Sequence, residues 1–367
     1  MKQKRFFVAA GMSCLVFLFI FLAFGLTYAA EEKAKVIELK FANFFPPPAG
    51  QSKICEEFIQ ELEARTGGRV KVRYFAGGSL LAAPAMIKGI ESGTTDIGLS
   101  HVEYTLGRFP VTEVCDLPLG YPTGWSSNQI VNDFYNKFKP KEWDKVKVLW
   151  LHANSPSVLI TKKPVRKMED LKGMIIRAPG RIGEVIAALG GTPAPTPVVE
   201  TYDAISKGVL DGSFTGMETL KTFRFGEVAK FVTISWQVGN VYTFYVAMNK
   251  DSYKKLPPDI KEIFDALCGE FRERMALTWN QIDFEAVDFG KANNVEFIDL
   301  TDEEAARWIK AVEPVNEGYV KSMVGAGHAE AEVRGWIKYL KERNEYLTAK
   351  QRGFRIKSAT GPKDMRP

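Results

Sequence analysis

Residues 169–216 decide the fold predicted for this chain. They read EDLKGMIIRAPGRIGEVIAALGGTPAPTPVVETYDAISKGVLDGSFTG. The apolar run Gly173 to Ile176 is typical of a short strand buried on both faces, and Arg177 closes it just before a Pro179–Gly180 turn and a helix over 182–189. Because open α/β sheets bind ligands in the crevice at the carboxyl ends of their strands, we expect the Arg177 guanidinium to face such a crevice.

The chemistry of Arg177 has two interpretations at this stage. A guanidinium is planar, always charged and carries five N–H donors in a fork that matches a carboxylate, so the residue could hold an anionic ligand. Alternatively, Arg177 pairs with an Asp or Glu of its own chain and only joins two layers of the fold. Spacing alone leaves both interpretations open.

The wider pattern resembles the solute-binding proteins of TRAP transporters, the DctP type. The resemblance rests first on GMIIRAPG (173–180) and on GTPAPTPVVETYDAISKGVLDG (191–212). It continues in unbroken order over roughly residues 36 to 300. The further matching segments are Leu39–Asn43, Thr66–Val70, Gly77–Leu80 leading into Gly93–Gly98, and Asp116–Pro118.

The resemblance implies a periplasmic receptor that captures a small organic acid. Such receptors deliver it to a membrane permease of one small and one large integral subunit, driven by a sodium gradient. The family's carboxylate-binding arginine falls on Arg177. Thr215 stands where many members carry an asparagine, and Ser157 stands where acidic-sugar binders carry a second arginine. These two departures favour a monocarboxylate with a compact or aromatic body.

The first thirty residues predict a secretory signal peptide. Lys2, Lys4 and Arg5 precede an uncharged apolar run from Phe6 to Leu26, and cleavage is expected after Ala29 or Ala30. The run is also long enough to serve as an uncleaved anchor. Removal of its three positive charges lowers the net charge from +5 to +2, so the sequence predicts a periplasmic protein without nucleic acid as a partner.

Hydrophobic periodicity predicts an α/β fold with a two-lobed periplasmic-binding-protein architecture, crossing hinge strands and a long helix that spans both lobes. The long helix is expected over 260–293, which contains no proline and is too long for one lobe. Strands are expected at 36–42, 70–75, 96–100, 146–152, 157–161, 174–177, 212–216 and 236–248, and other helices at 51–65, from Pro84, at 128–138, 182–189, 199–207 and twice within 303–344. The last dozen residues are expected to be loose.

The same pattern predicts the division of the chain. Residues 1–30 form the signal peptide, 31–154 with 241–280 form lobe I, 155–240 with 281–310 form lobe II, and 311–367 form C-terminal helices and a tail. The lobes are expected to close about segments 153–157 and 240–243. The long helix leaves a monomer and a dimer equally open.

No catalytic constellation, cofactor motif or metal-ligand spacing is present, so we predict a binding protein that is not an enzyme and needs no cofactor or metal. A secreted enzyme or a sensor-type binding protein on the same scaffold is the alternative. Cys55, Cys115 and Cys268 match no metal or redox motif and are predicted to be small core residues.

The candidate ligand site is assembled from strand ends and crossing segments. His101 follows the strand at 96–100, where it either contacts the ligand or is a satisfied structural residue. The aromatic residues, including Phe244, either form walls of the site or belong to the core. The predicted site residues are Arg177, Thr215, His101, Tyr104, Phe44, Trp236, Ser157 and Tyr242.

Overall fold

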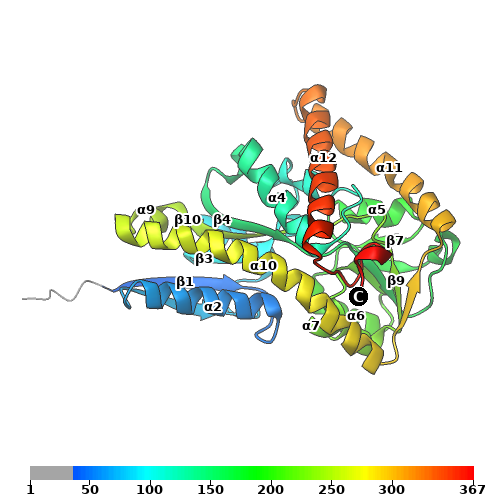
Figure 1. Ribbon diagram of the computed structural model, residues 1–367, viewed down its shortest axis with the longest axis horizontal. Coiled ribbons are helices and arrows are strands. Elements are labelled where there is room, and N and C mark those ends of the chain that lie inside the picture. Colours follow the sequence, from blue (N-terminus) through cyan, green and yellow to red (C-terminus); the bar gives the residue numbers. More distant parts are fainter. Residues whose placement is uncertain (1–35) are drawn as a thin grey trace, which may run out of the picture.

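The computed structural model describes residues 36–367, which form two β-sheets with helices packed around them (Figure 1). The predicted signal peptide, residues 1–30, lies outside the described residues. Within the described part of the chain, no helix is both long and apolar enough to cross a membrane. The mixed α/β class predicted from the sequence is confirmed by the two sheets.

The first sheet contains five strands in the order β2-β1-β3-β10-β4. β1 pairs in parallel with both β2 and β3, whereas β10 runs antiparallel to its neighbours and returns from a distant part of the sequence. The helix expected at 128 begins four residues earlier, because the Thr123 side chain accepts a hydrogen bond from Ser126 N and caps it. The elements are β1 (Ile37–Asn43), α2 (Gly50–Arg65), β2 (Val70–Phe75), α3 (Met86–Glu91), β3 (Ile97–His101), α4 (Gly124–Phe138), β4 (Val146–Ala153), β10 (Thr243–Asn249) and α9 (Lys250–Lys254).

The second sheet contains six strands in the order β11-β9-β5-β8-β6-β7. Three of them, β7, β9 and β11, were not predicted from the sequence. β7 and β11 are short strands at the two edges, and β7 contains Pro193, which lacks the N–H that a central strand needs. The elements are β5 (Val158–Thr161), β6 (Ile175–Arg177), α5 (Ile182–Ala188), β7 (Thr192–Ala194), α6 (Val198–Ser206), β8 (Gly212–Thr215), α7 (Thr219–Thr222), α8 (Phe225–Val228), β9 (Phe231–Ile234) and β11 (Glu296–Asp299).

Two segments, 154–157 and 235–242, carry the chain between the sheets. They are hydrogen-bonded to each other, since Ser157 N donates to Asn240 O (3.0 Å) and Tyr242 N donates to Asn154 Oδ1 (2.6 Å). The strand predicted over 236–248, interrupted only at Gly239–Asn240, is therefore wrong in its first half, because regular strand begins at Thr243. Gly239 has a φ of +61°, and a Cβ there would lie 2.3 Å from the backbone of Gly120, so this crossing needs a glycine and cannot be regular strand.

The long helix α10 (Pro258–Ala292) lies across both halves of the molecule (Figure 1). It packs against α2, α4 and β4 beside the first sheet and against α7 and α8 beside the second. Phe271 and Trp279 are fully buried on its inner face. The predicted spanning helix is therefore confirmed, two residues longer at its start than expected.

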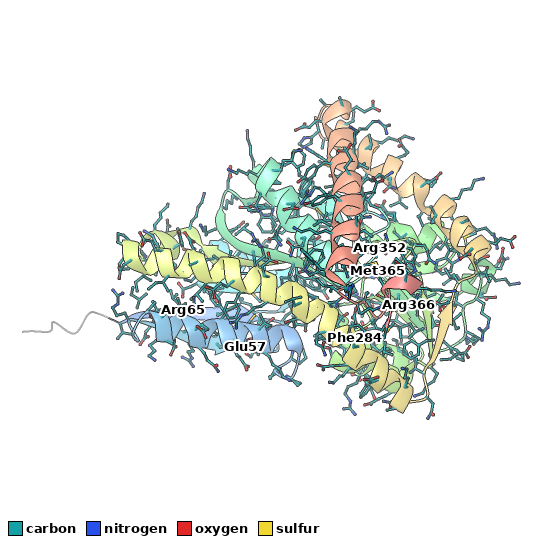
Figure 2. The ribbon with its side chains drawn as sticks, in the orientation of Figure 1. Glu57, Arg65, Phe284, Arg352, Met365 and Arg366 are labelled. Atoms are coloured by element: carbon teal, nitrogen blue, oxygen red, sulfur yellow. The ribbon has the colours of Figure 1, made fainter. Side chains whose placement is uncertain are left out.

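The C-terminal residues do not form a loose tail. After α11 (Asp302–Gly325) and α12 (Glu330–Phe354), the chain folds back, and Figure 2 shows Arg352, Met365 and Arg366 gathered at the end of α12. Met365 is buried, and Arg366 Nη1 lies 2.8 Å from Asp299 Oδ1 beside the second sheet. The prediction of a loose end was wrong, because a polar composition does not reveal hydrogen bonds and ion pairs made to distant residues.

Candidate functional site

A cavity lies where the carboxyl ends of β1, β3, β4, β6 and β8 meet. Its volume is about 20 Å³, which is room for about one water molecule. Six of its thirteen lining residues are Phe or Tyr, and the others are one arginine, one glutamate, one histidine, one valine and three neutral polar residues. The lining residues are Phe44, Phe45, His101, Tyr104, Asn154, Arg177, Val198, Thr215, Glu218, Thr219, Phe223, Tyr242 and Phe244.

The structure brings six of the eight predicted site residues to this cavity. They are Arg177, Thr215, His101, Tyr104, Phe44 and Tyr242. Ser157 and Trp236 are not among the lining residues. Both lie in the crossing segments, where the Ser157 hydroxyl accepts a hydrogen bond from Asn240 Nδ2 (3.3 Å) and Trp236 is only partly buried.

Arg177 is 2% exposed, and its guanidinium makes hydrogen bonds only to neutral groups. Nε donates to Thr196 O (2.9 Å), Nη1 to the Tyr242 hydroxyl (3.2 Å) and Nη2 to the Tyr104 hydroxyl (3.1 Å). No carboxylate within residues 36–367 forms an ion pair with it. The interpretation in which Arg177 pairs with an acid of its own chain is therefore wrong, and a positive charge lies buried without a countercharge in contact.

Two tyrosines complete the surroundings of this charge. The Tyr104 hydroxyl accepts from Val198 N (3.2 Å) as well as from Arg177, so it joins the end of β3 to the second sheet. The Tyr242 hydroxyl donates to Phe214 O (2.6 Å), and burial raises the pKa of Tyr242 although the Arg177 charge acts against this. Arg177 is thus held by two phenol hydroxyls rather than by a carboxylate.

His101 is 1% exposed, and neither ring nitrogen has a hydrogen-bond partner. Burial first, then the charge of Arg177, lowers the pKa of His101 well below its usual range. Asp116 Oδ2 lies 3.9 Å from Nε2, but burial raises the pKa of that carboxyl well above its usual range, so this contact is not a charged pair. A neutral imidazole with two unused nitrogens is thus available to a ligand.

Sequence reasoning missed three polar residues of the site, Asn154, Glu218 and Thr219, of which the first two matter most here. Asn154 directly follows β4, and its Oδ1 atom anchors Tyr242 N. Glu218 follows β8 by three residues, is 4% exposed, and has no hydrogen-bond partner for Oε2. The rule that selected Arg177, a polar side chain after a buried strand, could have found both.

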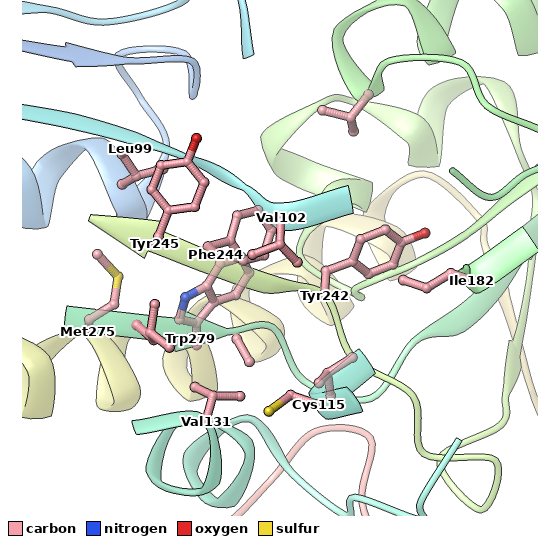
Figure 3. Packing of buried hydrophobic residues seen from close by; sticks show 14 of the residues in the cluster. Leu99, Val102, Cys115, Val131, Ile182, Tyr242, Phe244, Tyr245, Met275 and Trp279 are labelled. Atoms are coloured by element: carbon pink, nitrogen blue, oxygen red, sulfur yellow. The ribbon is translucent and has the colours of Figure 1, made fainter. Parts of the chain in front are cut away.

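The aromatic residues around the cavity form one continuous cluster with the core. Phe244 stacks on Phe44 with ring centroids 6.3 Å apart and on Trp279 of α10 at 5.2 Å. Figure 3 shows Tyr242 and Phe244 on the same segment, with Trp279 next to Phe244. Phe44, Tyr104, Tyr242 and Phe244 line the cavity, and Phe244 also packs against Trp279, whereas Trp236 does not line the cavity. That these aromatics form the walls of a ligand site stays a prediction.

A second contact joins the two halves beside the cavity. Arg181 N donates to Glu103 Oε2 (2.9 Å), and the Arg181 guanidinium lies 3.3 Å from Glu113. Gly180 has a φ of +58°, and a Cβ there would lie 1.7 Å from Glu103 Oε2, so the predicted Pro179–Gly180 turn requires its glycine. Burial, followed by the charge of Glu113, raises the pKa of Glu103 to about 8.

The described residues hold no group of three or more His, Cys, Asp or Glu side chains that could bind a metal ion. Cys55, Cys115 and Cys268 are all buried free thiols, which confirms their prediction as small core residues. Burial raises the pKa of each thiol. These cysteines are therefore unreactive packing residues.

Comparisons with known proteins agree on one family. Residues 41–322 match family 7 of the bacterial extracellular solute-binding proteins, DctP. A TRAP periplasmic solute-binding protein from Desulfovibrio salexigens, solved as an open complex with the C-terminus of a symmetry mate in its ligand-binding site, is 32% identical with a TM-score of 0.73, over 83% of this chain and 95% of that one.

Two further relatives extend this agreement. A TRAP solute-binding protein from Rhodoferax ferrireducens in complex with copurified benzoate is 24% identical, with a TM-score of 0.80 over 85% of this chain and 100% of that one. A solute-binding protein from Albidiferax ferrireducens is 26% identical over 290 residues, 75% of this chain and 84% of its own length. The first likeness supports the fold, and the second supports the family.

Proposed function

Because this chain belongs to family 7 of the bacterial extracellular solute-binding proteins, we propose that it binds a small monocarboxylate through an ion pair with Arg177. It then delivers this acid, in the periplasm, to the small and large membrane subunits of a TRAP permease for sodium-coupled uptake. Binding occurs without turnover of the ligand. The observation that carries this proposal is the buried Arg177 guanidinium, which has no acidic partner.

A buried charge without a countercharge is costly, and a ligand carboxylate would supply the missing charge. Arg177 presents Nη1 and Nη2 to neutral tyrosine hydroxyls, and these two nitrogens can form a paired hydrogen bond with a carboxylate. The Thr215 hydroxyl and the Asn154 amide line the same cavity and can add one or two bonds to that group.

The composition of the cavity favours one carboxylate. Arg177 is the single cationic side chain of the lining, so a second carboxylate would be buried unpaired. The rest of the lining is largely aromatic, which suits an apolar or aryl body. The benzoate in the Rhodoferax ferrireducens relative is a ligand of this type.

Ligand entry requires the site to open. A cavity of about 20 Å³ holds no organic acid, so the two halves must separate about the crossing segments 153–157 and 240–243. Closure afterwards excludes water, and the lower local dielectric strengthens the ion pair. The lobe boundaries that the sequence predicts belong to this same proposal.

Calorimetric titration tests the proposal, with benzoate, phenylacetate, propanoate, succinate and glucuronate as probes. We expect one monocarboxylate to bind at 1:1 stoichiometry and to raise the melting temperature. Arg177→Met should weaken that binding by about 100-fold or more, and Arg177→Lys, which keeps the charge but loses the fork, by an intermediate factor. Unchanged affinity in Arg177→Met, or tighter binding of succinate than of every monocarboxylate, would contradict it.

A further inference from the structure

Glu218 is, like Arg177, a buried charged-type residue of the cavity lining that forms no ion pair within residues 36–367. It follows β8 and precedes α7, is 4% exposed and lines the same cavity as Arg177. Its Oε2 atom is buried without a hydrogen-bond partner, and it forms no ion pair. Buried polar atoms are nearly always bonded, so an unused oxygen beside a ligand cavity indicates a bond that is made when the ligand is present.

The groups that face Glu218 decide its charge. Asp283 of α10 lies behind it and Arg177 of β6 lies across the cavity, while His101, Tyr104 and Tyr242 are neutral neighbours in the lining. Burial, followed by the charge of Asp283, raises the pKa of Glu218 well above its usual range, and the Arg177 charge opposes this.

Asp283 reinforces that effect. It is 1% exposed, and burial raises its pKa to about 7. The Ser155 hydroxyl and the Glu218 N–H face this carboxyl, but neither oxygen has a partner within hydrogen-bond geometry. Because both carboxyls are buried with raised pKa values and a charge on Asp283 disfavours one on Glu218, the two groups together retain at least one proton near neutral pH.

Ligand binding further favours the protonated form of Glu218. Once a ligand carboxylate neutralises Arg177, the only cation that favours a charged Glu218 is removed, and a new negative charge lies next to it. A neutral Glu218 is then both a donor and an acceptor of hydrogen bonds. Such a group matches an uncharged polar substituent, whereas an ammonium group would require a charged carboxylate.

We propose that Glu218 is the specificity-determining second anchor of the site and binds a hydroxyl or oxo group on the body of the ligand. This deepens the proposed function and rests on it: Arg177 holds the carboxylate, and Glu218 selects a hydroxy or oxo acid over the unsubstituted acid. Binding at pH 7 should therefore be accompanied by uptake of a proton into the Glu218 and Asp283 pair.

Two matched series of ligands test this inference by calorimetric titration. The first is propanoate, lactate, pyruvate and alanine, and the second is phenylacetate, mandelate, phenylglyoxylate and phenylglycine. Within whichever series binds, the hydroxy or oxo acid should bind about tenfold more tightly than the unsubstituted acid. Titration in buffers of different ionisation enthalpy should show proton uptake.

Three variants assign the effect to Glu218. Glu218→Leu should remove the tenfold preference and the proton uptake but leave binding of the unsubstituted acid within about threefold. Glu218→Gln, which keeps a donor and an acceptor, should retain most of the preference and lose the proton uptake. Glu285→Gln, an exposed acid paired with Lys221 on α7, is the matched control and should change neither.

The outcomes separate this inference from the proposed function. Equal affinity for substituted and unsubstituted acids in the unchanged protein, or an equal loss of both in Glu218→Leu, would overturn the role of Glu218 while leaving the Arg177 receptor intact. Tightest binding of alanine or phenylglycine, lost in Glu218→Gln, would replace it with a charged anchor for an amino acid. Failure of all eight acids, and of benzoate and glucuronate as well, to bind would overturn the proposed function itself.

Discussion

Arg177 and Arg181 lie four residues apart at the same edge of the second sheet, yet only the guanidinium of Arg181 pairs with acidic side chains. Arg181 lies 3.3 Å from Glu113 and 3.2 Å from Glu184, and its backbone N–H bonds to Glu103. Arg177 is more deeply buried and contacts only a carbonyl group and two phenols. The first charge is neutralised within the chain, whereas no carboxylate of residues 36–367 forms an ion pair with the second.

This difference teaches how to separate a structural arginine from a ligand-binding one. Position in the sheet does not distinguish the two, because both residues face the contact between the halves. Burial does not either, since a paired arginine can be buried as deeply as an unpaired one. The presence of a countercharge within the chain is the property that differs, and it appears only when segments distant in sequence are folded together.

The sharpest test of this comparison exchanges each guanidinium for an apolar chain of similar length. Arg181→Met should lower the free energy of unfolding by about 3 kcal/mol, because it leaves Glu103 and Glu113 buried together without their cation. It should change the affinity for the bound acid by less than about threefold, in contrast to Arg177→Met. Chemical denaturation and titration of both variants measure the two effects.

The opposite pattern would break the comparison. If Arg177→Met lost as much stability as Arg181→Met and bound the acid normally, both arginines would be structural. Loss of both stability and binding in Arg181→Met would instead mean that the ion pair of its guanidinium with Glu113 is needed to form the site.

A smaller effect should appear in the pH dependence of stability. The pKa of Glu103 is about 8 in the folded protein against an ordinary value of 4.5, so the folded state binds its proton more tightly than the unfolded state. This contribution to stability is complete below about pH 4.5 and is lost as the pH rises through about 8. At pH 8, where the Glu103 carboxyl is half ionised, the unchanged protein should therefore have lost most of this contribution.

Glu103→Gln should remove that dependence. The variant should melt several degrees higher than the unchanged protein at pH 8 and at a similar temperature at pH 5, because an amide cannot ionise. Glu184→Gln, a half-exposed acid beside the same Arg181, is the control and should give a much smaller difference. A pH profile that is parallel in both proteins would mean that Glu103 is not the group responsible.

The sequence predicted the fold where the pattern is local. The proline-free run of α10 and the apolar strands β3, β4 and β8 were found because periodicity and length are properties of the segment itself. The edge strands β7 and β11 were missed because each is stabilised by its neighbour in the sheet. The packed C-terminus was missed for the same reason, since its contacts with Asp299 and α12 are not visible in its composition.

The candidate site was predictable one residue at a time but not as a set. Arg177, Thr215 and His101 were found because each closes a buried strand, and strand ends converge in this type of sheet. Trp236 was placed at the site as an aromatic residue of a strand end or crossing segment, and it does lie in the crossing segment but does not line the cavity. Tyr104 and Tyr242 were predicted site residues, but their hydrogen bonds to Arg177 could not be foreseen, because they lie 73 and 65 residues away along the chain.

The smallest expected effect concerns Tyr104. Its hydroxyl accepts from Arg177 Nη2 and from Val198 N, two donors from the second sheet that a ligand carboxylate oxygen could equally use. In this structure the Tyr104 hydroxyl therefore uses two hydrogen-bond donors for which a ligand carboxylate would compete. Tyr104→Phe should free both donors and bind the acid about fivefold more tightly, as expected for the loss of one competing hydrogen bond.

Tyr242→Phe supplies the contrast. The Tyr242 hydroxyl also contacts Arg177, but it donates to Phe214 O at the same time, so its removal leaves a buried carbonyl unsatisfied and one nitrogen of the guanidinium less well held. We expect weaker binding and lower stability in this variant. If Tyr104→Phe weakened binding as well, its hydroxyl would be a direct ligand contact. The two phenols would then form a preorganised binding site with Arg177, because they would stay in place and contact the bound acid.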